Sequence, residues 1–323
     1  MNATFYLFDV DHGQCAALQL PDGRWCMFDA GRTASFSPIS WLAAKNGATE
    51  YASLFAPAPS PSPPCIYKAT VSHLHGDHIA DWPSLRRFGP DLLRTVAYDR
   101  QYLADVAASS ASGSLDALQA LTQDHVNSFG PARQIPDYGG SLIYERELGV
   151  DIARSIGGPP NSRVNNASVV TRIHCHGTSI LLCGDVETEA WKYAFTQSFH
   201  FDDWRRLVSG VDVLVAPHHG HSAGFSPELL RLANPRVVLV SIRSRDEHAD
   251  ERYSDSAFVR GELINGETRR CITTRQSGHI RLSLTQGVSL LEPLAGNTRR
   301  YWTFGDVAIE RYVGLGQLLR GYR

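Results

Sequence analysis

The sequence predicts an α/β fold with one large domain, and three observations support this prediction. Short apolar runs typical of strands alternate with helical segments along most of the 323 residues. Three of the apolar runs end in clusters of histidine and aspartate. The composition is 43% hydrophobic, which is enough to bury a substantial core in a chain of this length. The formal net charge of −2 argues against a strongly basic nucleic-acid-binding surface, although it leaves room for a local basic groove.

The N-terminal third is predicted to consist of strands joined by turns, with helices between the later strands. The strands "TFYLFDV" and "WCMFDAG" lie on either side of a "PDGR" turn signal. A helix is expected within "SFSPISWLAAK", before a connection rich in proline and serine. The run "IYKATV" then predicts a strand that leads into a histidine cluster, and "DWPSLRRFGPDLLRTVAYD" predicts a helix followed by a strand.

The rest of the chain is predicted to contain a helical insertion and then further alternation. Residues 100–163 form the expected insertion, with a poorly ordered stretch near "GGPPNSRV". Strands follow in "ASVVTRIHCHG", "TSILLCGDVE" and "VDVLVAPHHG". The segment "SPELLRLANP" predicts a helix with Ser226 as its N-cap and Pro227 at its first position. "RCITTRQSGHIRLSL" is interpreted as a hairpin that turns at "QSGH". We expect one domain over residues 1–290 and a C-terminal extension over residues 291–323 that packs on the domain or binds a partner.

The cysteines and the N-terminus indicate a cytoplasmic protein. The six cysteines are scattered, contain no C-x-x-C pair, and are interpreted as reduced, mostly buried thiols (Cys15, Cys26, Cys65, Cys175, Cys183, Cys271). The opening "MNATFYLFDV" is interpreted as a strand rather than a signal peptide. No apolar run reaches the length of a bilayer span, so we expect no membrane association.

The segment "VSHLHGDHIADW" concentrates metal-ligand side chains at the end of a predicted strand. His73, His75 and Asp77 alternate and can face the same way, and a turn at Gly76 can bring in His78. Two further clusters follow apolar strands, namely Asp185 in "LLCGDVE" and the histidines of "LVAPHHGH" (His218, His219, His221). Imidazole and carboxylate together suit zinc, iron or manganese. A single histidine at a strand end is usually structural, but four ligand-type residues within six positions favour a metal site.

The motif H-x-H-x-D-H after a strand is the signature of the metallo-β-lactamase fold, and the chain resembles the ComEC-type branch of that superfamily. This branch takes its name from the soluble domain of the bacterial DNA-uptake channel. The ordered matches, spread over about residues 4–285, are "FDVDHGQCAAL", "WCMFDAG", "NNASVV", "LLCGD", "VDVLVAPHHGHS" and "TRQSGHIRLSL". The resemblance implies a four-layer αβ/βα sandwich with metal ions at one rim.

The resemblance also implies a ligand set for two divalent metal ions. His73 and His75 would bind one ion, Asp77 and His78 would bind the other, and Asp185 would bridge them. His219 would supply the last ligand. Zinc is favoured, with manganese and iron as the alternatives. Many relatives have one more ligand histidine before the G-D motif. His125, His174 and His176 are the candidates here, and the alternatives are an ion completed by water or a site faced by Asn165 or Asn166.

Residues around the ligands receive supporting roles. Asp29 would orient a ligand histidine, unless it only caps a turn. Where the branch has G-Q-G-D, this chain has Asp11-His12-Gly13-Gln14, and His12 would contact substrate or be an ordinary loop residue. His221 and Asn166 are further candidates to lie beside the ligands or contact substrate. His218 or His221 would stabilise charge on the substrate or protonate a leaving oxygen.

The expected activity is hydrolysis by a metal-bound hydroxide that Asp77 and Asp185 position, with His218 as the third catalytic residue. The ComEC-type resemblance implies a phosphodiester substrate, DNA or RNA in particular, and Arg243 is a candidate phosphate contact. Because the same machinery serves other substrates, the alternatives are a hydrolase of a small ester, thioester or lactone, and a partner-dependent module with a latent site. The motivation for the partner is the C-terminal extension, which mixes aromatic residues with arginines.

Overall fold

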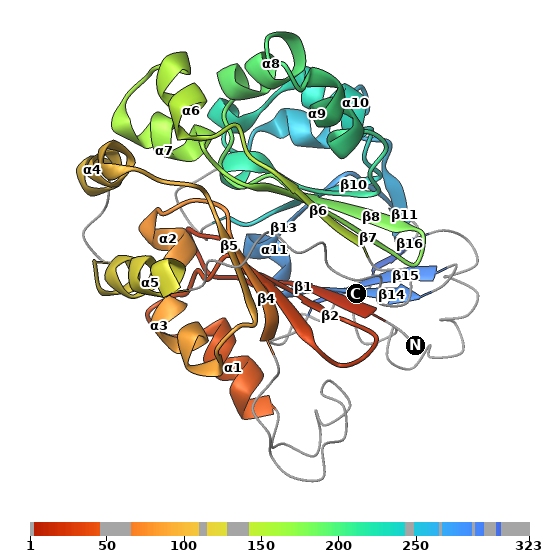
Figure 1. Cartoon of the computed structure of the whole chain (residues 1–323). Coiled ribbons are helices and arrows are strands. Elements are labelled where there is room, and N and C mark those ends of the chain that lie inside the picture. The colour runs from red at the N-terminus through yellow and green to blue at the C-terminus, as the bar shows by residue number, and fades with distance from the viewer. Residues whose placement is uncertain are drawn as a thin grey trace.

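Two β-sheets pack face to face, and helices cover the outer face of each sheet (Figure 1). The computed structural model describes residues 3–45, 66–109, 115–127, 142–242, 249–264, 267–285, 288–293 and 302–304. The order of layers is helix, sheet, sheet, helix. The α/β class and the four-layer αβ/βα arrangement that the sequence predicts are therefore confirmed.

The first sheet has the strand order β16-β15-β14-β1-β2-β3-β4-β5. Its strands pair antiparallel from β16 to β3 and parallel from β3 to β5. The bounds are β1 (Ala3–Leu7), β2 (Ala16–Gln19), β3 (Trp25–Phe28), β4 (Ile66–Val71), β5 (Leu92–Thr95), β14 (Ile280–Thr285), β15 (Val288–Pro293) and β16 (Trp302–Phe304).

The second sheet has the strand order β13-β10-β9-β8-β7-β6. Strands β8, β9, β10 and β13 run parallel, and β6 and β7 complete the sheet in antiparallel pairing. The bounds are β6 (Leu142–Arg146), β7 (Val170–Cys175), β8 (Thr178–Leu182), β9 (Val213–Val215), β10 (Val237–Val240) and β13 (Cys271–Thr273). A separate two-stranded sheet pairs β11 (Glu262–Ile264) with β12 (Glu267–Arg269).

The helices form an early and a later set in chain order. In Figure 1, α1, α3 and α5 lie beside the first sheet, α8, α9 and α10 lie beside the second sheet, and α6 and α7 lie on the side of α8. The early set is α1 (Pro38–Lys45), α2 (Gly76–Ile79), α3 (Trp82–Leu85), η2 (Arg86–Phe88), α4 (Arg100–Ser109), α5 (Leu115–Asn127), α6 (Val150–Ile156) and α7 (Pro160–Asn166). The later set is α8 (Thr188–Thr196), α9 (Phe201–Val208), η3 (Pro217–Gly220), η4 (Ser222–Gly224), α10 (Pro227–Ala233), η5 (Glu251–Ser254) and α11 (Thr274–Ser277).

Three hydrophobic cores lie between the four layers. Along β1, Phe5 and Leu7 belong to the core between the sheets, whereas Tyr6 and Phe8 belong to the core under the N-terminal helices. This division follows from the alternation of side chains along a strand. The third core packs α8, α9 and α10 against the second sheet, with Trp191 at 0% exposure. Because both faces of each sheet are buried at their centres, central strands such as β3 (WCMF), β9 (VLV) and β10 (VVLV) are continuous apolar runs.

Several predicted elements are confirmed in detail. The "PDGR" turn joins β2 to β3, which pair antiparallel. Helix α10 begins at Pro227, and the Ser226 Oγ accepts a hydrogen bond of 3.2 Å from the backbone N–H of Leu229. Among the described cysteines, four are buried free thiols and Cys271 is a partly buried one, while Cys65 lies outside the described residues.

The predicted hairpin at "RCITTRQSGHIRLSL" is wrong. Strand β13 pairs parallel with β10 in the second sheet, whereas β14 pairs antiparallel with β1 in the first sheet. Between them, Thr273 caps the short helix α11 by accepting a hydrogen bond from the backbone N–H of Gln276 at 3.3 Å. The segment therefore crosses from one sheet to the other, which its local turn signal does not reveal.

The predicted insertion of residues 100–163 is helical in large part, but it also contributes a strand. The described residues form α4, α5 and α6, and β6 pairs with β7 at the edge of the second sheet. The stretch "GGPPNSRV", expected to be poorly ordered, includes the start of α7 at Pro160. Proline at the first helical position favours this start, because its missing N–H needs no partner there.

The C-terminal segment extends the first sheet where the structure describes it. Strand β15 spans the domain boundary expected at residue 290, and β16 pairs with β15. Residues 305–323, on which the predicted partner-binding role mainly falls, lie outside the described residues. No helix in the described part of the chain has both the length and the apolar character that spanning a membrane requires.

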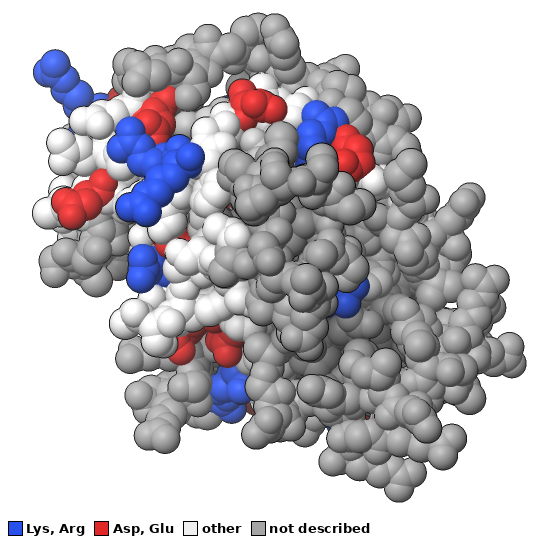
Figure 2. Space-filling model, turned by 90° about the horizontal axis from the view of Figure 1, so that it is seen from below, with Lys and Arg blue, Asp and Glu red and all other residues white. Residues whose placement is uncertain are grey.

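Charged side chains are mixed on the face seen from below. Figure 2 shows Lys and Arg side chains interspersed with Asp and Glu rather than gathered into one continuous patch. This distribution matches the near-neutral net charge of the whole chain.

A buried ion pair joins the two sheets beside the strand that carries the histidine cluster. The Lys68 Nζ on β4 lies 2.5 Å from the Glu145 Oε2 on β6, and the side chains are 9% and 11% exposed. The Thr70 Oγ1 donates a second hydrogen bond of 2.6 Å to the Glu145 Oε1. The two sheets are therefore held in register at this edge by polar contacts as well as by the core.

We predict that Lys68→Met destabilises the protein by about 3 kcal/mol, because it leaves the Glu145 carboxylate buried without its cation. Urea unfolding at pH 7 would measure the loss. The double variant Lys68→Met, Glu145→Met should recover most of it, because no unpaired charge then remains. Equal destabilisation by the single and double variants would contradict this account.

Candidate metal centre

The ligand-type residues predicted from three separate motifs meet at one rim of the sandwich. His73, His75 and the helix α2 with Asp77 and His78 follow the end of β4. Asp185 follows β8, and His219 lies in η3 after β9. Strand β4 belongs to the first sheet, whereas β8 and β9 belong to the second. The rim is therefore formed by strand ends from both sheets.

A first ligand group consists of His73, His75 and Asp185. The His73 Nε2 lies 3.1 Å from the His75 Nδ1 and 3.8 Å from the Asp185 Oδ2. Two ligand atoms that are each about 2.1 Å from one ion lie about 3.0–3.6 Å apart at angles of 90–120°. The atoms of this group are therefore spaced closely enough to share a metal ion after small adjustments.

A second ligand group consists of His78, Asp185 and His219. The His78 Nε2 lies 3.2 Å from the His219 Nε2 and 3.3 Å from the Asp185 Oδ1. The Asp77 Oδ2 lies 3.3 Å from the His219 Nε2 and 3.7 Å from the His78 Nε2, so Asp77 borders the same space. Asp185 belongs to both groups, which is the position expected of a carboxylate that bridges two ions.

The electrostatics of the cluster favour a cation at its centre. Burial lowers the pKa of His73 and His75, and the nearby His78 lowers the pKa of His73 further. Burial also acts to lower the pKa of His219, but the Asp185 and Asp77 carboxylates outweigh it and raise that pKa to about 10. The same balance, with Asp185 foremost among the carboxylates, holds the pKa of His78 well above its ordinary value. The carboxylates thus stabilise positive charge where two imidazole nitrogens face each other, and a divalent ion would supply such a charge.

Hydrogen bonds around the cluster leave the ring nitrogens that face its centre available as ligands. The Ser109 Oγ donates to the Val106 carbonyl at 2.9 Å, so it can accept from the His75 Nε2–H, also at 2.9 Å. The Nδ1 of His75 is then unprotonated and faces His73. Such partners fix the tautomer of ligand histidines in metal sites.

His78 is oriented in the same way by Asp29. The His78 Nδ1–H donates to the Asp29 Oδ2 at 2.9 Å, so its Nε2 faces the cluster without a proton when an ion is bound. Asp29 is itself held by the backbone N–H of Ser72 at 2.6 Å and by the Gln14 Nε2 at 3.0 Å. The buried Asp185 Oδ1 accepts no hydrogen bond that meets the usual geometry among the described residues, and it lies 3.3 Å from the His78 Nε2. The Nδ1 of His75, the Nε2 of His78 and the Oδ1 of Asp185 are therefore available to bind a divalent metal ion.

Unusual backbone conformations concentrate around the site. Asp29 has a φ of 58°, and the consecutive residues His218 and His219 have φ values of 50° and 53°. Residues other than glycine seldom adopt this left-handed region, at a cost of about 1 kcal/mol or more each. The surrounding structure holds them there, and for His219 the result is an imidazole aimed at Asp77 and Asp185.

Asn166, His218 and His221, which were predicted to lie beside the ligands or contact substrate, differ in where their side chains lie. Asn166 is 2% exposed and its Oδ1 accepts from the backbone N–H of Glu187 at 2.9 Å, so it fixes the loop after Asp185 rather than facing the ligands. The His218 Nδ1 lies 3.9 Å from the Glu187 Oε1, and its ring stacks on His221 with centroids 5.5 Å apart. His218 and His221 therefore form a second imidazole pair beside the ligand groups.

Two of the three candidates for an additional ligand histidine, His174 and His176, do not join the first group. Ser168, just before β7, contacts His73, so the far end of β7 with His174 points away from the site. His176 lies in the turn beyond that end. The side chain of His125 and the whole of Arg243 lie outside the described residues.

Sequence reasoning missed several residues that orient the ligands. Ser72 and Ser168 place their Oγ atoms 3.0 Å and 3.2 Å from the His73 Nδ1. Ser72 directly precedes His73, and Ser168 lies within the "NNASVV" match. Both residues therefore adjoin motifs that already pointed to the site. Ser109 lies in a run of small residues within the insertion, and nothing in its local sequence signals a contact with His75.

Comparison with known structures finds metallo-β-lactamase fold proteins. The metallo-β-lactamase fold protein YhfI from Bacillus subtilis is 12% identical, with 84% of this chain and 95% of that chain covered and a TM-score of 0.41. The short form of human tRNase Z is 16% identical, with 76% and 95% covered and a TM-score of 0.33. A diphosphatase from the PhnP family is 11% identical, with 75% and 87% covered and a TM-score of 0.38.

No protein-family model and no curated protein matches the chain. The similar structures reported above are 11–16% identical to this chain. The mixed α/β architecture of two sheets with flanking helices is established by the strand order and the three cores of the chain itself.

Proposed function

We propose that the protein is a metal-dependent hydrolase that holds two divalent ions in the two ligand groups. The observation that carries this proposal is the position of Asp185, whose side chain is 5% exposed and belongs to both groups. A buried carboxylate between three imidazoles is well suited to join two ions at short separation. The proposed ligands are those predicted from the sequence (His73, His75, Asp77, His78, Asp185, His219).

The residues around the ligands determine what such a site does. Divalent ions supply Lewis-acid polarisation and an activated water at neutral pH. Asp77, with a side chain 23% exposed, lies nearer to solvent than Asp185 and is placed to orient the incoming nucleophile. The partly exposed His218, beside Glu187, is placed to contact the substrate or its leaving group. We therefore retain Asp77, Asp185 and His218 as the proposed catalytic residues.

The proposed substrate is a phosphodiester. Support comes from the ordered ComEC-type motifs of the sequence, which in this branch accompany DNA-linked functions, and from a ligand set that suits zinc or manganese. The described residues in Figure 2 mix basic and acidic side chains and form no continuous basic track, and the net charge of the chain is −2. Because tight binding to a long duplex depends on many phosphate contacts, we favour a short, single-stranded or small phosphodiester.

Hydrolysis assays with the metal-loaded protein test the proposal. The substrates would be bis-p-nitrophenyl phosphate, labelled single- and double-stranded DNA and RNA, and a small ester, thioester and lactone, each with zinc or manganese. We expect metal-dependent phosphodiester cleavage that Asp185→Asn reduces by at least about 100-fold, because the shared ligand is weakened. The control His174→Ala removes an imidazole at the far end of β7 and should retain activity.

The outcomes separate the candidate functions. Cleavage of the ester, thioester or lactone alone would replace the phosphodiester by a small acyl substrate. Full activity of Asp185→Asn would overturn the proposed site, whichever substrate is cleaved.

We also predict that Asp29→Asn weakens metal binding by about 10–100-fold, because an amide can donate to the His78 Nδ1 and so favour the tautomer with a proton on Nε2. Calorimetric titration of the metal-free protein with zinc would measure the change. Asp212→Asn is the matched control. The Asp212 Oδ2 accepts from the backbone N–H of Ser179 at 2.9 Å, at the end of β9 opposite to His219. Equal affinities for Asp29→Asn and the wild type would show that Asp29 only caps its turn.

A further inference from the structure

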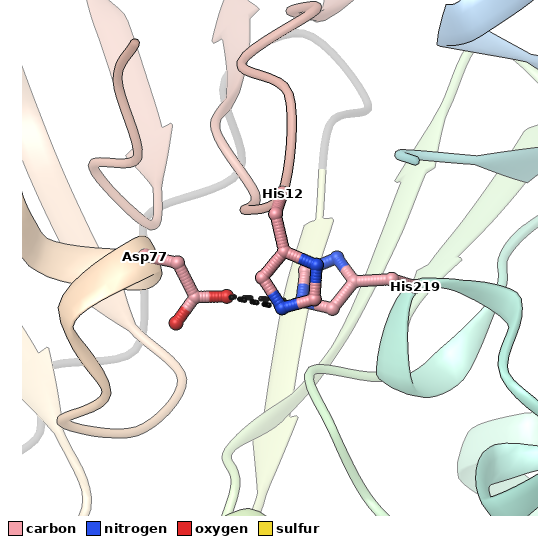
Figure 3. A group of neighbouring side chains, drawn as sticks. All are labelled: His12, Asp77 and His219. Carbon is pink, nitrogen blue, oxygen red and sulfur yellow. Dashed lines mark ion pairs between the residues drawn. The ribbon is translucent and has the colours of Figure 1, made fainter. Parts of the chain in front are cut away.

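A third group of ligand-type atoms overlaps the second, and it includes His12. The ligand atoms of His12, Asp77 and His219 all lie within 4.8 Å of one another. Figure 3 shows the three side chains approaching from separate elements, with the imidazoles of His12 and His219 next to the Asp77 carboxylate. The His12 Nε2 lies 3.7 Å from the Asp77 Oδ2, and the rings of His12 and His219 have centroids 4.9 Å apart.

We infer that His12 is an additional protein ligand of the ion held by His78, Asp185 and His219. The inference rests on the metal site of the proposed function and extends it by one residue. His12 belongs to the loop between β1 and β2, which supplies no residue to the ligand set implied by the family resemblance. Where the resemblance predicts G-Q-G-D, this chain has Asp11-His12-Gly13-Gln14, so the imidazole is a feature of this chain.

The loop that carries His12 is packed directly on Asp77. A Cβ at Gly13 would lie 2.5 Å from the Asp77 carbonyl oxygen, and a Cβ at Gly31 would lie 2.5 Å from the same atom. Real side chains do not tolerate such a distance to backbone, so both positions require glycine. The backbone of the loop is therefore as close to a metal-ligand residue as packing allows, with His12 immediately beside Gly13.

Hydrogen bonds fix the same loop from two further directions. The Ser241 Oγ, at the end of β10, donates to the Gly13 carbonyl at 2.6 Å. The Gln14 Nε2 donates to the Asp29 Oδ2, the carboxylate that also accepts from His78. The backbone N–H of Gly31 donates to the Gln14 carbonyl at 2.9 Å. The anchors at Gly13 and Gln14, directly after His12, thus belong to the framework that positions the ligands, which distinguishes His12 from an ordinary exposed loop residue.

The position of His12 differs from that of the buried ligands in one respect. Its side chain is 43% exposed, whereas those of His78 and His219 are 0% and 1% exposed. It therefore approaches the second group from the solvent side and would occupy a coordination position that water would otherwise take. The first group has no such additional residue among the described ranges. Substrate is then expected to bind mainly at the ion held by His73, His75 and Asp185, since an open position is what a catalytic ion needs.

Metal titration and cobalt spectroscopy test the inference apart from activity. The metal-free full-length chain, as wild type, His12→Ala and Asp11→Asn, would be titrated with zinc against a chromophoric chelator. In parallel, Co²⁺ would be added and the visible d–d bands recorded. We expect His12→Ala to lose at least about tenfold in affinity for one of two ions, with stronger Co²⁺ bands as its coordination number falls. Asp11→Asn, which changes the same loop but keeps the imidazole, should match the wild type.

The outcomes distinguish this inference from the proposed function. Two ions of unchanged affinity and an unchanged Co²⁺ spectrum in His12→Ala would overturn the inference and leave the proposed metal site intact. A wild-type protein that binds no zinc or cobalt would overturn both. If Asp11→Asn loses as much affinity as His12→Ala, the loop backbone rather than the imidazole is responsible, and the inference fails. Thermal unfolding of each metal-free variant would show that the variants are folded.

Discussion

The buried carboxylate of Asp185 imposes the main constraint on this structure. Among the described residues, its ion pairs run to His73, His78 and His219, at 3.3–3.8 Å. An isolated buried carboxylate is costly unless it is paired and hydrogen-bonded. The imidazoles come from strand ends in both sheets, so the sheets must meet with these ends aligned for the charge to be compensated. The inter-sheet core and the Lys68–Glu145 pair maintain that alignment. Bound divalent ions would balance the negative charge of Asp185, which neutral imidazoles do not balance.

The part of the site that could be predicted from the sequence is the part encoded by local patterns. His73, His75, Asp77 and His78 lie within six residues, and the structure places all four at the cluster. Asp185 and His219 follow apolar strands in recognisable motifs. The crossing from β13 to β14 could not be foreseen, because a turn signal does not show which sheet each strand joins. The orientation of His75 by Ser109 was equally hidden, since it depends on how a distant helix packs.

Helix α4, which carries Ser109, shows that the insertion of residues 100–163 contributes to the site. Helix α4 places Ser109 against His75 and buries Tyr102, whose hydroxyl accepts from the backbone N–H of Leu74 at 3.4 Å. Helix α7 ends at Asn166, which holds the loop after Asp185. The two helices contact each other closely, so a change in one can be transmitted to both ligand groups. The insertion therefore helps to set the tautomer of one ligand and the position of the shared carboxylate, in addition to covering one side of the rim.

The two ligand groups differ in the number of protein ligands, so the two ions would have different roles. The first group contains His73, His75 and Asp185 among the described residues, whereas the second contains His78, His219 and Asp185, is bordered by Asp77 and is approached by His12. Additional protein ligands hold an ion more tightly and leave fewer positions for exchange. The second ion would then act mainly as a fixed charge that anchors Asp185, and the first would be the exchangeable centre where substrate is polarised. A histidine in the loop where the resemblance predicts G-Q-G-D, a motif without histidine, is thus consistent with different roles for a structural ion and a catalytic one.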